Sequence, residues 1–142
     1  MALSVTAIIE RSSESYYSIH TIEHFDNFRL YGYGETPEKA KEDFWASYNE
    51  IKEMMPDDVP EIEVSFKYDV ASFLQEYRDK LSLSGLEAIA GVNQKQLQHY
   101  LSGRRKPSAT TINRIQEGIH AFAERLKSVE FALVDNKSQI NR

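Results

Sequence analysis

Two short helical patterns joined by a glycine turn occupy residues 83–107, and this stretch constrains the fold more than any other. Ser84 is placed to cap the first helix, and Glu87 three residues later is placed to complete a capping box. Gly91 stands where a helix must end in the left-handed conformation, which glycine adopts without steric penalty. Asn93 is placed to cap the second helix. The stretch therefore predicts a helix-turn-helix.

The second helix of this stretch turns apolar residues inward, keeps a polar outer face and ends in a basic run. In a DNA-binding helix-turn-helix this helix enters the major groove, where Gln matches the adenine edge and Lys the guanine edge. Basic residues beside it suit phosphates. The candidate DNA-binding residues are Asn93, Gln94, Lys95, Gln98, His99, Ser102, Arg104, Arg105 and Lys106. The alternative interpretation is an ordinary helical hairpin with a glycine corner.

The first half of the chain alternates apolar and polar residues, which is the pattern of half-buried strands. Three such strands precede Gly34, and a fourth covers residues 61–68. Between them, Thr36 and Pro37 provide the cap and first-turn proline of a helix with an apolar stripe. We expect a β-β-β-α-β domain over residues 1–68, with an antiparallel meander and the helix lying across the sheet.

The sequence after residue 69 has helical spacing of apolar residues, which predicts helices in the second half. Asp69 can cap a helix reaching about Asp79, which we expect to be the first helix of a DNA-binding bundle. Ser108 caps a long helix whose apolar stripe extends to Val129 and exceeds what a small bundle needs, so the stripe serves either a dimer contact or plain core packing. Residues 131–134 read as a short terminal strand or a helix end. The expected fold class is thus α+β, with an all-α helix-turn-helix domain over residues 69–134 and a flexible tail over 135–142.

Composition narrows the functional classes. The absence of cysteine excludes disulfides and thiolate metal sites, and no apolar run reaches membrane-spanning length. With no signal peptide recognisable at the start, we expect a cytoplasmic protein. Residues 1–68 carry 6 Lys/Arg and 14 Asp/Glu, a net charge of −8, whereas residues 69–142 carry 11 and 8, a net charge of +3. This asymmetry indicates different partners for the two halves.

The stretch from the turn to the basic run resembles the DNA-binding domains of the phage-repressor-like, Xre-type class. The resemblance includes Leu86, the Gly91-Val92-Asn93 turn, Leu97, and the run from Ser102 to Ser108. One position departs from the class: Glu87 stands four residues before the turn glycine, where a small residue is usual.

Most of the chain, roughly residues 3–128, resembles the HicB antitoxin family. The resemblance rests on the β-β-β-α-β order, Tyr17, Asp26 eight residues before Gly34, and the run from Gly34 to Ala40, followed by the helix-turn-helix. The segment 25–29 lacks the family's usual Pro/Gly-rich turn. The resemblance implies a reduced ribonuclease H-like domain and an antitoxin that binds a small ribonuclease toxin and represses its own operon.

We expect no enzymatic activity, no cofactor and no metal. Nuclease chemistry needs several carboxylates converging on magnesium, and only Glu10, Asp26 and Asp43 are candidates near the expected sheet edge. The four histidines show no metal-ligand spacing. The expected partners are operator DNA, a small basic toxin protein and a second copy of the chain, because paired half-sites restore specificity. The alternative is a stand-alone regulator whose N-terminal domain only dimerises or binds a small ligand.

Overall fold

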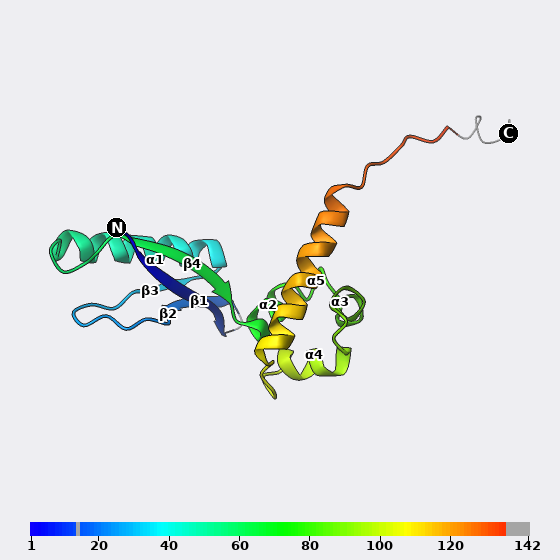
Figure 1. Cartoon of the computed structure of the whole chain (residues 1–142), viewed down its shortest axis with the longest axis horizontal. Coiled ribbons are helices and arrows are strands. Elements are labelled where there is room, and N and C mark those ends of the chain that lie inside the picture. Colours follow the sequence, from blue (N-terminus) through cyan, green and yellow to red (C-terminus); the bar gives the residue numbers. More distant parts are fainter. Residues whose placement is uncertain (14, 136–142) are drawn as a thin grey trace. The chain divides into compact units, whose positions relative to one another are not determined.

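In the computed structural model of the protein, residues 1–13 and 15–135 are described. The strands within these ranges are β1 (Leu3–Ser13), β2 (Tyr16–Thr21), β3 (Tyr31–Gly34) and β4 (Ile62–Tyr68). The helices are α1 (Pro37–Met54), α2 (Val70–Glu76), α3 (Leu83–Ala90), α4 (Gln94–Leu101) and α5 (Ala109–Lys127) (Figure 1). The chain divides into two compact units, the first formed by Met1–Lys80 with His99–Lys106 and the second by Leu81–Gln98 with Pro107–Arg142.

A four-stranded mixed sheet in the order β3-β2-β1-β4 forms the base of the first unit. The expected antiparallel meander of the first three strands is confirmed, with Ile9 opposite Ile19 and Ile19 opposite Gly32. β4 then pairs parallel with β1, so that Val5 lies opposite Val64. The connection through α1 carries the chain from one edge of the sheet to the other, because parallel neighbours require a crossover.

Helix α1 covers one face of this sheet, as expected. The side chain of Thr36 accepts a hydrogen bond from the backbone N–H of Lys39 (3.1 Å), which fixes the start of the helix. Ala40, Phe44 and Tyr48 of α1 are buried against apolar residues of the strands. β3 lies so close to α1 that a Cβ added at Gly32 would come within 2.3 Å of the carbonyl oxygen of Ala40. Gly32 is therefore required by the close contact between β3 and α1.

The expected fold class, a β-β-β-α-β domain followed by an all-α bundle, is wrong. The structure is a small α+β fold in which a four-stranded mixed sheet is accompanied by helices spread across the chain. Helix α2, expected to open the bundle, belongs to the sheet unit. The hydroxyl of Ser72 in α2 accepts a hydrogen bond from the backbone N–H of Arg11 (2.8 Å), and Phe73 packs edge-on against Tyr68 of β4. Helix α2 is thus fastened to the end of the sheet, and the expected boundary at residue 69 differs from the observed division after Lys80.

The second unit is held together by the packing of α3 against α5. The predicted cap of α5 is confirmed, since the side chain of Ser108 accepts a hydrogen bond from the N–H of Thr111 (3.2 Å). Ile115 in the first half of α5 is buried. Residues 131–134 form neither the expected strand nor a helix end, and instead lack regular structure. Of the expected tail over 135–142, residues 136–142 lie outside the described residues.

Within the described residues, no helix combines the length and apolar character needed to cross a membrane.

Candidate nucleic-acid interface

The turn between α3 and α4 has the geometry expected from the sequence at Gly91 and differs at the start of α3. Gly91 ends α3 in the left-handed conformation, with φ 71° and ψ 20°. The N-cap of α3 is Ser82, whose side chain accepts a hydrogen bond from the N–H of Gly85 (3.0 Å). The prediction of Ser84 as the cap was wrong by two residues, because both serines have suitable chemistry and only the backbone path decides between them.

Glu87 caps the next helix instead of its own. Its Oε1 accepts a hydrogen bond from the backbone N–H of Gln94 at 2.7 Å, while the side-chain oxygen of Asn93 accepts one from the N–H of Lys95, also at 2.7 Å. Two of the otherwise unpaired N–H groups at the start of α4 are satisfied in this way. The acidic residue that departs from the Xre-type pattern therefore connects α3 to α4, and the expected capping box with Ser84 is corrected.

Two residues of α5 that were not predicted from the sequence, Arg114 and Gly118, lie against the turn and the end of α3. The guanidinium Nη2 of Arg114 donates a hydrogen bond to the carbonyl oxygen of Gly91. At Gly118, an added Cβ would come within 2.7 Å of the carbonyl oxygen of Ile89 and 2.8 Å of the Cα of Ala90. A glycine in the middle of a helix disfavours that helix, which was the one sequence signal for a close contact here.

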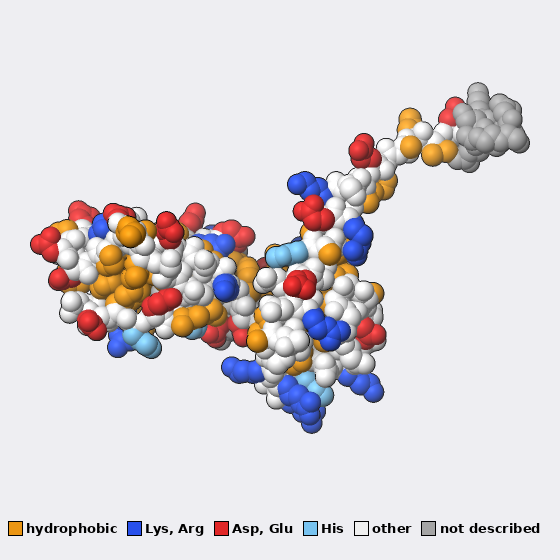
Figure 2. All heavy atoms as spheres, viewed as in Figure 1, with side chains coloured by type: hydrophobic (Ala, Val, Ile, Leu, Met, Phe, Trp, Pro, Cys, Tyr) orange, Lys and Arg blue, Asp and Glu red, His pale blue; other side chains and the backbone are white. Residues whose placement is uncertain are grey.

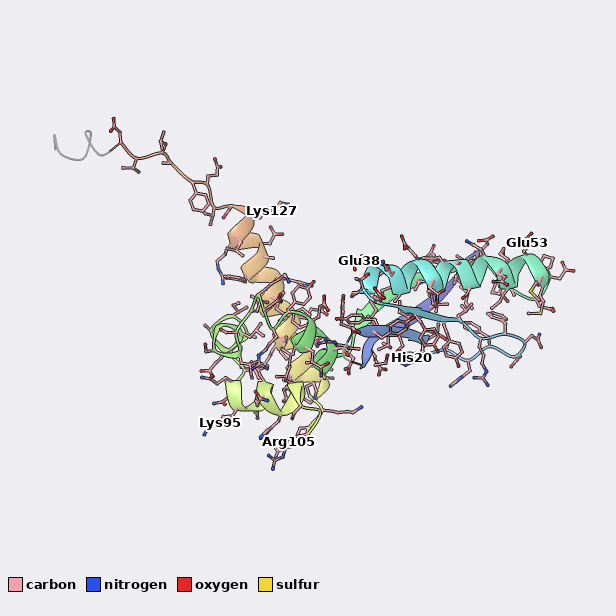
Figure 3. All side chains as sticks on the ribbon, turned by 180° about the vertical axis from the view of Figure 1, so that it is seen from behind. His20, Glu38, Glu53, Lys95, Arg105 and Lys127 are labelled. Atoms are coloured by element: carbon pink, nitrogen blue, oxygen red, sulfur yellow. The ribbon has the colours of Figure 1, made fainter. Side chains whose placement is uncertain are left out.

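The first part of α4 presents polar side chains to solvent. Leu97 is buried, whereas Gln94, Lys95 and Gln98 are exposed, as is Asn93 before the helix. Lys95 projects away from the ribbon (Figure 3). A groove of about 410 Å³ opens here, lined by Leu83, Glu87, Asn93, Gln94, Lys95 and Gln98. The structure thus brings four of the predicted DNA-binding residues together on one surface of the second unit.

His99 differs from its expected place on the exposed face. Its side chain is half-buried, and its Nδ1 is buried without a hydrogen-bond partner among the described residues. Its backbone carbonyl oxygen accepts hydrogen bonds from the hydroxyl of Ser102 (3.2 Å) and from the N–H of Arg105 (3.2 Å). His99 therefore shapes the end of α4 through its backbone.

The basic run after α4 is fully exposed. Ser102, Arg104, Arg105 and Lys106 are all exposed, and Gly103 turns the chain between them with φ 79°. Arg105 projects into solvent (Figure 3), and Lys and Arg side chains gather where α4 ends (Figure 2). These residues belong to the first compact unit, whereas Asn93 to Gln98 belong to the second, because the division between units passes through α4. Exposed guanidinium and ammonium groups of this kind are suited to phosphate oxygens.

The acidic side chains considered for nuclease chemistry have other partners or stand apart. Glu10 lies 3.5 Å from Nδ1 of His20, and the carboxylate of Asp43 accepts a hydrogen bond from the backbone N–H of Tyr33 (2.9 Å). Asp26 is exposed in the loop between β2 and β3. In the ranges 1–13 and 15–135, no group of three or more His, Asp or Glu side chains is arranged to hold a metal ion.

The same loop borders a cavity of about 280 Å³ in the first unit. Phe25 and Phe28 stack with ring centroids 4.6 Å apart, and the carboxylate of Glu23 is held by the backbone N–H of Thr6 (3.0 Å). His20, His24 and Arg29 also line this cavity. This cavity has a size close to that of small-ligand sites.

In comparisons with known proteins, no family model, no curated protein and no solved structure matches this chain.

Proposed function

We propose that this protein is a DNA-binding transcriptional repressor of the cytoplasm that contacts its operator through α4 and the basic run after it, as a homodimer or larger oligomer. The observation that carries the proposal is the start of α4. Glu87 and Asn93 satisfy its backbone N–H groups, while the side chains of Gln94, Lys95 and Gln98 extend into solvent. A helix whose backbone is fixed in this way needs no rearrangement to enter a major groove, and its exposed hydrogen-bonding side chains can then reach base edges.

We further propose that the repressor is an antitoxin whose N-terminal domain neutralises a small basic ribonuclease toxin. The support is the net charge of −8 on residues 1–68 and the resemblance of the chain to the HicB family. Opposite charge speeds association with a basic partner. The protein itself has no enzymatic role in this proposal, and it needs no cofactor.

A stand-alone regulator is the second candidate, and the cavity beside Phe25 and Phe28 favours it. Its volume of about 280 Å³ is close to the lower end of small-ligand sites, and it combines aromatic rings with His and Arg side chains. In this version the N-terminal domain binds a small molecule or only dimerises.

The proposal is tested by selecting duplexes that bind the full-length protein from a random pool and measuring their affinity over a salt series. We expect a selected sequence to bind at least about a thousandfold more tightly than random DNA, with affinity falling steeply as salt rises. Recovery of no preferred sequence, together with salt-independent affinity, would contradict the proposal. Binding to the product of an adjacent reading frame then separates the antitoxin from the stand-alone regulator.

A further inference from the structure

The end of α5 and the segment after it carry apolar side chains that are exposed among the described residues. Along α5, Ile115 is 4% exposed, whereas Ile112 at the start of the helix is 40% exposed and Leu126 near its end is 56% exposed. Beyond the helix the exposed fractions are 52% for Val129, 95% for Phe131 and 101% for Leu133. The helical core of the second unit therefore buries the middle of the stripe at Ile115, and in the part of the chain that the structure describes the apolar side chains from Leu126 onward stay exposed.

The segment from Val129 to Val134 places apolar residues at strand spacing but belongs to no strand in the described part of the chain. Helix α5 ends at Lys127, and Ser128 caps it by donating its backbone N–H to the carbonyl oxygens of the last turn. The chain then continues without regular structure (Figure 1). Val129, Phe131 and Leu133 stand at every second position, so in an extended chain they share one face, with Glu130, Ala132 and Val134 on the other. An extended apolar segment that is not part of a sheet can act as a template for pairing with another chain.

We propose that Leu126–Val134 is a self-association surface, in which this segment pairs with the same segment of a second copy of the chain and covers the exposed end of α5. Antiparallel pairing about a twofold axis satisfies the backbone groups of both segments with one another. It also brings Phe131 and Leu133 of each copy onto a shared apolar layer that continues from Leu126. This inference rests on the proposed function, because it names the surface through which the proposed repressor forms its dimer.

The exposed area suffices for a dimer. The apolar side chains at positions 126, 129, 131 and 133, of which Phe131 and Leu133 are almost fully exposed, together bury about 500 Å² per copy when covered, or about 1,000 Å² for the pair. This area meets the minimum of about 1,000 Å² for a biological interface. A partner of strong opposite charge is a poorer fit, because Glu130 is the only charged residue between Val129 and Val134.

Sedimentation velocity of the full-length protein at micromolar concentration, without DNA, tests the surface. We expect a dimer for the wild type. Phe131→Asp is expected to weaken dimerisation by at least about a hundredfold, because each copy loses a buried ring and gains a charge at the contact. The fold is expected to be unaffected, since this side chain is 95% exposed within one copy. Met54→Asp is the matched control: Met54 is 74% exposed at the end of α1, and its substitution is expected to leave the dimer intact.

Cross-linking identifies the contact directly, because the chain contains no cysteine. We expect a short bis-maleimide to link two copies of Ala132→Cys and not two copies of Met54→Cys. A monomeric wild type, whether its segment is free or folded onto its own chain, overturns the inference, as does a Phe131→Asp variant that remains dimeric. A dimer that binds no preferred DNA contradicts the proposed function and leaves this surface standing.

Discussion

The carboxylate of Glu87 in α3 accepts a hydrogen bond from the backbone N–H of Gln94 at the start of α4, at a distance of 2.7 Å. The two residues are joined across the turn at Gly91, so the contact fixes how the second helix begins relative to the first. A carboxylate near a helix N-terminus is also favoured by the helix dipole. One residue thus supplies both a cap and a connection between the two helices.

Glu87→Ala is expected to lower the free energy of unfolding by about 1 kcal/mol, because the N–H of Gln94 loses its acceptor. Glu87→Gln retains an acceptor oxygen and is expected to lose less. Urea unfolding of both variants measures the difference. Glu117→Ala, at an exposed glutamate of α5, is the control and is expected to change stability by less than about 0.5 kcal/mol. Equal stability of wild type and Glu87→Ala would remove the capping role.

Substitutions of Gln98 and Arg105 are expected to change DNA affinity in different ways. Gln98→Ala is expected to weaken binding to the selected duplex by roughly 1–3 kcal/mol and to leave random DNA nearly unchanged, because in the proposed interface its exposed amide would read a base edge. Arg105→Ala is expected to weaken both duplexes alike and to reduce the salt slope by about one per subunit. Affinities for both duplexes over a salt series decide the roles. Parallel loss on both for Gln98→Ala would exclude base readout by this residue.

Gly118→Ala is expected to destabilise the second unit by about 1–3 kcal/mol, although alanine is the better helix former by about 1 kcal/mol. The added Cβ would meet the backbone of α3 at Ile89 and Ala90, within 2.7 and 2.8 Å respectively. Thermal unfolding of this variant measures the loss. Gln116→Ala, at an exposed position of the same helix, serves as the control, and a stabilised Gly118→Ala would show that α3 and α5 lie further apart.

Ionisation of the Tyr68 hydroxyl is expected to lower the free energy of unfolding at alkaline pH. Burial raises the pKa of Tyr68 to about 12 from an ordinary value of 10.0, with Tyr77 and Glu38 adding to the rise. The unfolded chain therefore releases this proton first, so the contribution is complete below pH 10.0 and is lost as pH rises through about 12. Urea midpoints across this window are expected to fall less for Tyr68→Phe than for wild type. Tyr33→Phe, at an exposed tyrosine of β3, is expected to keep the wild-type loss.

The acidic N-terminal half is expected to bind a basic protein in a salt-dependent way. Residues 1–68 have a net charge of −8, so charge attraction contributes to the encounter and is screened as salt rises. Immobilised full-length protein, presented with the purified product of the adjacent reading frame over a salt series, measures this. Charge reversal of Glu50 and Glu53 on the exposed side of α1 is expected to weaken capture, whereas charge reversal of Glu124 on α5 is expected to leave it unchanged. Undiminished capture by the first variant would place the contact elsewhere.

Short-range features of the fold were determined by the sequence alone. The caps at Thr36 and Ser108 involve hydrogen bonds between residues three apart, and the left-handed turn at Gly91 depends on a missing Cβ. The four strands follow from alternation, which exposes one face and buries the other. At the candidate site, the same local reasoning located the start of α4 and the exposure of Gln94, Lys95 and Gln98, but not the partial burial of His99.

Only the tertiary structure decided which elements meet. The pairing of β4 beside β1, the attachment of α2 to the sheet through Ser72, and the contacts of Arg114 and Gly118 with the turn all join residues far apart in the chain. Glu87 shows the reason at a single residue: its carboxylate has chemistry for either of two helix starts, and the backbone path through Gly91 brings Gln94 to it. The sequence pattern indicates which side chains are favoured in the core or in a hydrogen bond. Which residue each side chain contacts depends on how all the elements pack around the core.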